Sequence, residues 1–233
     1  MSFDLAVWFE PERIPVSDAA GTYERLCDGD LAGAGVVASG AVAAFHRELT
    51  GRFPELSAAE GDGARAEASP WTAGLDVSAA HVIMPMSWSR ADGTAPEVVA
   101  LAGRHGLVCF DPQARVLHRP PAQRGTDALS LQPCVGLKVE DADPEVIERA
   151  VHRLSEDNWF LILEGRSGHF LQVGHGPNAG LSAGGFAVEH RDGSPERHYR
   201  CVLSERDQVA ALFADYASGT TTWSVDARWD SLF

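Results

Sequence analysis

Alternating and helically spaced apolar residues divide the first half of the chain into strands and helices. Residues 3–9 (FDLAVWF) alternate and are rich in aromatic and β-branched side chains, which is typical of a strand. Apolar residues recur at helical spacing over 36–52, and a second helical run over 95–106 ends at a glycine suited to a C-cap. The other expected elements are a helix with Ser17 as its N-cap and strands over 80–88 and 107–112.

The second half shows a similar mixture of short strands and helices. A predicted strand over 133–139 precedes a helix over 143–154, in which apolar residues recur at helical spacing. Two apolar strands, 158–165 and 168–174, are expected to pair as a hairpin across a glycine-flanked turn. The remaining predicted elements are strands over 185–191 and 198–203 and a final helix over 205–219.

A polar segment without periodicity, 117–128 (LHRPPAQRGTDA), separates the two halves. Its Pro-Pro pair and polar composition are typical of a linker. The chain has 233 residues, 45% of them apolar, which is enough for two separate cores. The sequence therefore predicts an α+β protein of two small domains, 1–120 and 129–233, each a mostly antiparallel sheet with helices packed on one face.

The charge of the chain narrows the range of partners. There are 33 Asp and Glu residues against 19 Lys and Arg, so the formal net charge is −14, and both halves are acidic. A surface of that sign repels phosphates, so we expect no direct nucleic-acid ligand. The same surface attracts a basic protein.

The cysteines and the N-terminus indicate the compartment. Cys27, Cys109, Cys134 and Cys201 form no CxxC motif, and we expect buried, reduced thiols. The N-terminus is acidic and lacks the basic start and apolar stretch of a signal peptide. No run approaches the roughly 18 apolar residues of a membrane span. The sequence predicts a cytoplasmic protein without membrane contact.

Nine histidines make metal or acid–base chemistry an alternative to consider. The chain has no HExxH motif, and its glycine-rich stretch 173–185 (VGHGPNAGLSAGG) lacks the P-loop pattern. The stretch 165–169 (GRSGH) departs from the GxSxG motif of α/β hydrolases. We expect no catalytic residue, no metal and no cofactor. The competing hypothesis is a hydrolase that uses His169, His175, His190 or His198.

The stretch 184–203 (GGFAVEHRDGSPERHYRCVL) combines two strands with a turn-forming DGSPE segment. Alternation places its apolar side chains on one face and Glu189, Arg191, His198 and Arg200 on the other. Opposite charges across strands stabilise such a hairpin by roughly 0.2–1 kcal/mol per pair. The charged face is therefore either a structural feature of the hairpin or a protein-binding surface.

Three ordered motifs in the second half carry a family resemblance. They are NWFLILEGRSGHFLQVG (158–174), GGFAVEHRDGSPERHYRCVL (184–203) and VAALFADYASGTTTWSVDARWDSL (209–232). With these motifs, residues 134–233 resemble an immunity-protein family of bacterial polymorphic toxin systems. The resemblance implies a non-catalytic protein that binds and neutralises a toxin, commonly a nucleic-acid deaminase. An acidic inhibitor would be steered to the basic substrate groove of such a toxin.

The first half resembles a different, uncharacterised type of actinobacterial protein. The matching elements are MSFDLAVWFE (1–10), SPW (69–71), WSRA (88–91) and GLVCFDPQ (106–113). No activity follows from this resemblance, and we expect an accessory domain. A non-catalytic scaffold without a toxin partner is the alternative function for the whole chain.

The predicted partner-binding residues lie in the charged hairpin and in the C-terminal tail. They are Glu189, Arg191, Asp192, His198, Arg200 and Trp229. In the tail, Trp223 is expected to pack near Phe213 and Tyr216 of the final helix, because large aromatic side chains favour burial. Trp229 is expected to be only partly buried.

Overall fold

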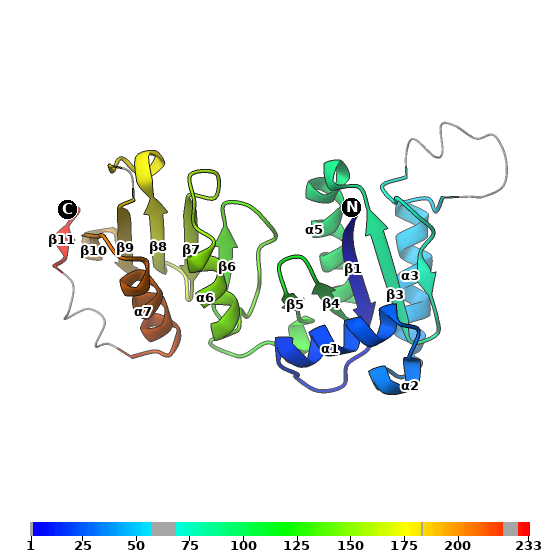
Figure 1. The fold of residues 1–233 in the computed structure, drawn as a ribbon. Helices are drawn as coiled ribbons and strands as arrows, with labels where there is room; N and C mark the ends of the chain where they lie inside the picture. Colours follow the sequence, from blue (N-terminus) through cyan, green and yellow to red (C-terminus); the bar gives the residue numbers. More distant parts are fainter. Residues whose placement is uncertain (1, 57–68, 183, 221–227) are drawn as a thin grey trace. The chain divides into compact units, whose positions relative to one another are not determined.

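The computed structural model describes residues 2–56, 69–182, 184–220 and 228–233. The chain divides into two compact units, Met1–Arg124 and Gly125–Phe233. Each unit contains one antiparallel sheet with helices packed alongside (Figure 1), which confirms the predicted α+β class. Within the described ranges, no helix is long and apolar enough to cross a membrane.

The first unit contains a five-stranded sheet of order β2-β3-β1-β4-β5. Its strands are β1 (Phe3–Trp8), β2 (Asp76–Val77), β3 (His81–Met86), β4 (Val108–Asp111) and β5 (Val116–His118). Its helices are α1 (Val16–Cys27), α2 (Leu31–Ala34), α3 (Gly40–Arg52), α5 (Trp88–Arg104) and the short 3-10 helix η1 (Pro121–Gln123).

Helices lie on both faces of this sheet, whereas the sequence pattern suggested one face. Ala6 and Trp8 project to one face and share a buried cluster with Leu26 of α1. Leu5 and Val7 project to the opposite face, where β1 contacts α5, and both are fully buried. A strand buried on both sides is apolar at nearly every position, as the run LAVW in β1 is.

Two helices of the first unit begin earlier than predicted. The N-cap of α1 is Pro15, so Ser17 lies inside the helix and does not cap it. Helix α5 begins at Trp88 and contains Pro96, the residue near which the sequence pattern placed its start. A proline within a helix costs one backbone hydrogen bond, which is why the pattern favoured a later start.

The segment predicted to be a linker, 117–128, is partly built into the first unit. Leu117 and His118 belong to β5, and both are buried. Arg119 is also buried, and its Nη2 donates a hydrogen bond of 2.9 Å to the carbonyl of Ile14. The division between the units falls at Arg124, inside this segment.

The second unit contains a six-stranded antiparallel sheet of order β11-β10-β9-β8-β7-β6. Its strands are β6 (Ser130–Pro133), β7 (Phe160–Glu164), β8 (His169–His175), β9 (Phe186–Asp192), β10 (His198–Leu203) and β11 (Asp230–Ser231). Its helices are α6 (Pro144–His152), α7 (Arg206–Ala217) and the 3-10 helices η2 (Gly176–Ala179) and η3 (Pro195–Arg197). The predicted hairpins β7–β8 and β9–β10 are confirmed.

The strand predicted over 133–139 is wrong. Strand β6 ends at Pro133, and the chain then turns back on itself. Leu131 and Val139 exchange backbone hydrogen bonds of 2.8 and 2.9 Å across this turn. Gly136 within the turn has a φ of 113°, a conformation that favours glycine and interrupts a strand.

Helices α6 and α7 cover one face of the second sheet. Leu163 and Leu171 project to that face and are fully buried, as are Val151 of α6 and Phe213 of α7. The alternate sheet residues project to the opposite side, which no α-helix of the described second unit covers. This opposite side is called the open face below. Its residues on the central strands are Phe160, Ile162, Glu164, Phe170, Gln172, Gly174, Ala187, Glu189, Arg191, His198, Arg200 and Val202.

The cysteines are free, as expected, but only two of them are buried. Cys109 and Cys201 lie in the two sheets and are buried, and burial raises the pKa of the Cys201 thiol to about 11. Cys27 at the end of α1 is exposed, and Cys134 is partly exposed.

Candidate functional site

The register of β9 and β10 brings four of the predicted partner-binding residues together on the open face. Glu189 lies opposite Arg200, and Arg191 lies opposite His198. Residues directly opposite in an antiparallel pair project to the same side, so all four share one face, as the alternation predicted. The hairpin is therefore charged on the side away from α6 and α7.

Glu189 is the centre of a polar network on this face. Its Oε2 accepts a hydrogen bond of 2.7 Å from Gln172 Nε2 and lies 3.2 Å from His198 Nε2. Its Oε1 lies 3.7 Å from Arg200 Nη1, and the Glu189 side chain is only 19% exposed. Arg200 Nη2 in turn donates to the carbonyl of Ala179 in η2 at 3.2 Å. The network thus joins three strands and fixes η2 above the end of the sheet.

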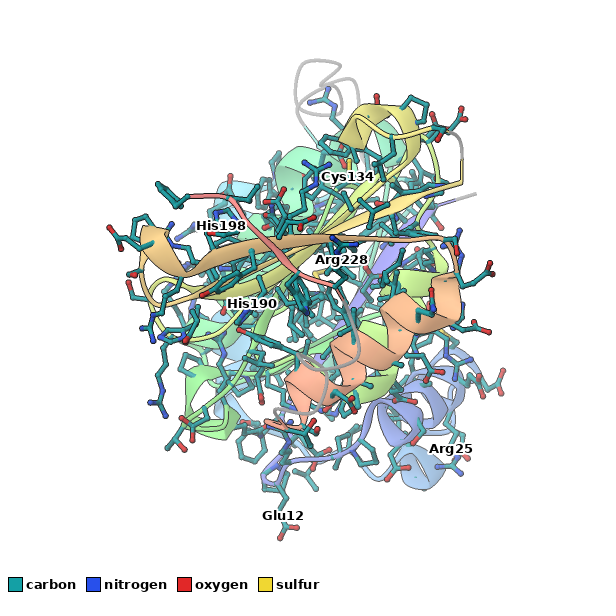
Figure 2. All side chains as sticks on the ribbon, turned by 90° about the vertical axis from the view of Figure 1, so that its left-hand side faces the viewer. Glu12, Arg25, Cys134, His190, His198 and Arg228 are labelled. Atoms are coloured by element: carbon teal, nitrogen blue, oxygen red, sulfur yellow. The ribbon has the colours of Figure 1, made fainter. Side chains whose placement is uncertain are left out.

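Asp192 and Trp229, the other two predicted residues, lie elsewhere. Asp192 is the last residue of β9, and its carboxylate lies 3.2 Å from His169 Nδ1 and 3.0 Å from Arg197 Nη1. Trp229 is partly buried, as predicted, and its ring contacts that of His190 at 6.4 Å. Figure 2 shows His190 on the side of β10 where α7 lies and His198 on the opposite side. Asp192 and Trp229 therefore do not belong to the open face.

The prediction that Trp223 packs on the final helix concerns a residue outside the described ranges.

The four histidines of the hydrolase hypothesis are distributed over different places in the second unit. His175 stacks on Phe186 at 4.7 Å, and His198 contacts Phe170 at 5.5 Å on the open face. Burial lowers the pKa of His190 to about 4, so this imidazole is neutral at pH 7. Within the part of the chain that the structure describes, no group of three or more His, Cys, Asp or Glu side chains is arranged to hold a metal.

A hollow of about 310 Å³ opens on the open face next to the Glu189 network. Phe160, Ile162 and Ala187 supply apolar surface, and Gln172, Glu189 and Arg200 supply the polar side. The other lining residues are Trp159, Val173, Gly174 and Ala179. Exposed apolar surface beside a few convergent polar groups is the usual composition of a binding site.

Two aromatic residues and one glycine shape this hollow. The rings of Trp159 and Phe160 meet edge to face at 5.0 Å. An added Cβ at Gly174 would lie 2.7 Å from the Cβ of Ala179, so only glycine lets η2 approach the strand this closely. Residue Ala179 thereby forms a wall of the hollow.

Sequence reasoning missed the residues of β7 that line the hollow. The signal was the strand FLILE, which is apolar at four successive positions. Helices cover only one side of this strand, so Phe160 and Ile162 remain half-buried on the other side. When helices cover only one face of a sheet, a strand that is apolar at successive positions leaves part of its apolar surface exposed on the other face.

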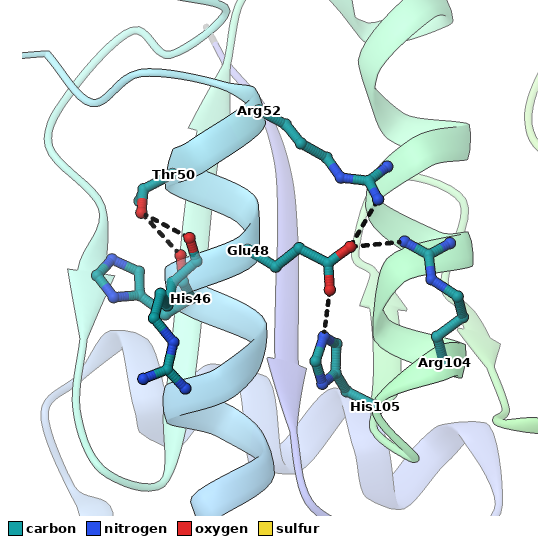
Figure 3. A network of polar contacts seen from close by, with 7 residues as sticks. His46, Glu48, Thr50, Arg52, Arg104 and His105 are labelled. Carbon is teal, nitrogen blue, oxygen red and sulfur yellow. Dashed lines mark hydrogen bonds and ion pairs between the residues drawn. The ribbon is translucent and has the colours of Figure 1, made fainter.

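A second polar network, in the first unit, joins α3 to the end of α5. Glu48 Oε1 accepts from Arg52 Nη2 at 2.6 Å and Arg104 Nη2 at 3.2 Å, and its Oε2 lies 2.9 Å from His105 Nε2 (Figure 3). The hydrogen bonds from His105, Arg52 and Arg104 lower the pKa of Glu48 to about 2. A carboxylate of such low pKa is a poor general base at pH 7, so we interpret this network as a structural link.

No protein-family model, curated protein or solved structure matches the chain.

Proposed function

We propose that this chain is a non-catalytic, immunity-like protein of the cytoplasm that binds and neutralises a toxin domain through the open face of its second unit. The single observation that supports this function most is the arrangement of that face. It combines a hollow with apolar walls, the exposed side chain of Val202 and the charged hairpin residues. Apolar surface bordered by polar residues marks protein-binding sites.

The partner that fits this protein is basic. The chain carries a formal net charge of −14, which steers a basic protein toward it over a distance of roughly one Debye length, about 8 Å at physiological salt. A toxin that acts on nucleic acid, such as a deaminase, has a basic substrate groove. The family resemblance of residues 134–233 supports the same class of partner. The first unit then serves as an accessory domain.

The experiment measures binding and neutralisation of toxin domains encoded next to this gene. Val202 is 59% exposed on the open face, and Val202→Arg places a charge there without entering the core. We expect this variant to weaken the complex at least about tenfold, because a charge is forced against apolar surface. The matched control is Val77→Arg, since Val77 is a strand valine of the first unit that is 42% exposed.

Three outcomes separate the hypotheses. Failure of every neighbouring toxin domain to bind the full chain would overturn the proposed function. Binding without loss of toxin activity would favour the alternative of a scaffold. Equal loss of binding in Val202→Arg and Val77→Arg would show that the open face is not the docking surface.

A second variant tests the charged part of the face. Arg191→Glu combined with Arg200→Glu is expected to abolish binding if the two guanidinium groups donate hydrogen bonds to the partner, since a carboxylate cannot donate them. Tighter binding of a basic partner to the double variant would show that the two arginines make no such contact. Arg200 also bonds to Ala179, so circular dichroism must show that the double variant remains folded.

A further inference from the structure

We propose, on the basis of the protein-binding function proposed above, that the hollow on the open face receives one aromatic side chain of the partner, a Trp or Tyr that donates a hydrogen bond to Glu189.

The size of the hollow matches one large side chain. Its volume of about 310 Å³ lies at the lower end of the range for ligand sites, roughly 300–1,000 Å³. One bulky side chain fits such a space. Ile162 and Ala187 offer apolar surface, and the edge-to-face pair of Trp159 and Phe160 offers aromatic surface. Aromatic rings pack favourably on such walls.

The polar side of the hollow selects a hydrogen-bond donor. Glu189 Oε2 is already engaged by Gln172. Glu189 Oε1 lies 3.7 Å from Arg200 Nη1, which is too long for a hydrogen bond, and it accepts none from the residues that the structure describes. A neutral N–H or O–H placed in the hollow would form a charge-assisted bond to this oxygen.

Charged groups fit the hollow less well than a neutral donor. An ammonium or guanidinium group would approach the guanidinium of Arg200, which lines the same side. A carboxylate would approach Glu189. The indole N–H of Trp and the phenol O–H of Tyr avoid both conflicts and carry a ring that the apolar walls can cover.

The surroundings of the hollow favour a protein over a free small molecule. Val202 lies directly opposite Ala187 in the register, so its exposed side chain extends the apolar surface beyond the hollow. A small molecule inside the hollow would leave Val202 uncovered, whereas a polypeptide would cover both. Buried Trp and Tyr residues that fill pockets are also the commonest sources of binding energy at protein interfaces.

The first experiment uses side-chain probes and the full-length protein. N-acetyl-tryptophanamide, N-acetyl-tyrosinamide and N-acetyl-phenylalaninamide are titrated while amide signals are followed by NMR. We expect saturable shifts at Gly174 and Ala187 with the Trp and Tyr probes, and binding of the Phe probe at least about fivefold weaker because it lacks a donor. Absence of saturable shifts at these residues up to the solubility limit of the probes would overturn the proposal.

Matched glutamate variants test the role of the carboxylate. Glu189→Gln is expected to lower the affinity for the Trp probe about fivefold, since a charge-assisted hydrogen bond becomes a neutral one. Glu164 lies on the open face of β7 but outside the lining of the hollow, so Glu164→Gln should leave affinity unchanged. Equal effects of the two substitutions, or equal affinity for the Phe and Trp probes, would contradict the assignment.

A last experiment, binding of a toxin domain to variants of the hollow, distinguishes failure of this proposal from failure of the proposed function. Ala187→Leu fills the hollow. It is expected to lower the affinity for a toxin domain at least as much as Glu189→Gln does. If a toxin domain binds both variants as tightly as the unmodified protein, while Val202→Arg abolishes binding, the function stands and the hollow has no part in it. If the probes bind but no neighbouring toxin domain does, the hollow is a site for a small aromatic molecule and the claim of a protein side chain is wrong.

Discussion

The two sheets of this protein are similar in size but differ in how they are covered. In the first unit, β1 has helices on both sides, and residues such as Leu5 and Trp8 are fully buried. In the second unit, α6 and α7 cover only one side, and β7 alternates between buried Leu163 and half-buried Ile162. A sheet with helices on both faces buries the side chains of both faces, and these side chains contribute to stability. A sheet covered once retains a face that is available for binding.

The largest expected effect comes from comparing two tryptophans. Trp8→Ala removes a fully buried ring that contacts Phe110, so the first unit should lose about 3–5 kcal/mol of stability. Trp159→Ala removes a half-exposed ring from the open face and should cost the second unit about 1 kcal/mol. Urea unfolding monitored by hydrogen exchange in peptides of each unit measures both values. Similar losses for the two variants would mean that the open face is structural.

A smaller contrast is expected between neighbours on one strand. Leu163→Ala creates a cavity under the helices and should cost about 2–5 kcal/mol. Ile162→Ala removes partly exposed surface on the other side of β7 and should cost about 1 kcal/mol. The same unfolding assay on the second unit reports the difference. If Ile162→Ala is the more costly change, something covers the open face in the free protein.

The most gradual expected effect is a pH dependence of the first unit, which is small over any single pH unit. Burial lowers the pKa of His118 to about 4, from about 6.5 in the unfolded chain, so only the unfolded chain gains a proton between these values. Stability is therefore complete above pH 6.5 and falls as the pH drops toward 4, by at most about 1.4 kcal/mol per pH unit. Unfolding measured across this range should show the slope, and His118→Gln should remove it. A slope that persists in the variant would assign it to other groups.

Patterns of period two predicted the second sheet better than the first. The faces of the β9–β10 hairpin followed directly from alternation, because one side is covered and the other is not. In the first unit, the same reasoning placed helices on one face of the sheet only. It treated the apolar strand β1 as if helices covered a single side of it. The strand predicted over 133–139 failed where Gly136 turns the chain, since apolar residues near a turn resemble a short strand.

The residues of the open face were grouped correctly from the sequence only where they are local along the chain. Glu189, Arg191, His198 and Arg200 share one hairpin, so alternation alone groups them. Asp192 and Trp229 were grouped with them by proximity along the chain, and tertiary contacts place them with His169 and His190 instead. The hollow depends on residues of three strands and η2, and on the close approach that Gly174 permits. No local pattern contains that information.

Each sheet ends on one side in a strand of only two residues, β2 in the first unit and β11 in the second. Both begin with an aspartate, Asp76 and Asp230, and all four residues of these strands are exposed. A long, flat edge strand offers unpaired backbone groups to another chain and promotes aggregation. Edges that are short and charged limit such pairing. At these two edges, a second chain therefore finds little backbone to pair with, and the contacts left to it there are mainly those of side chains.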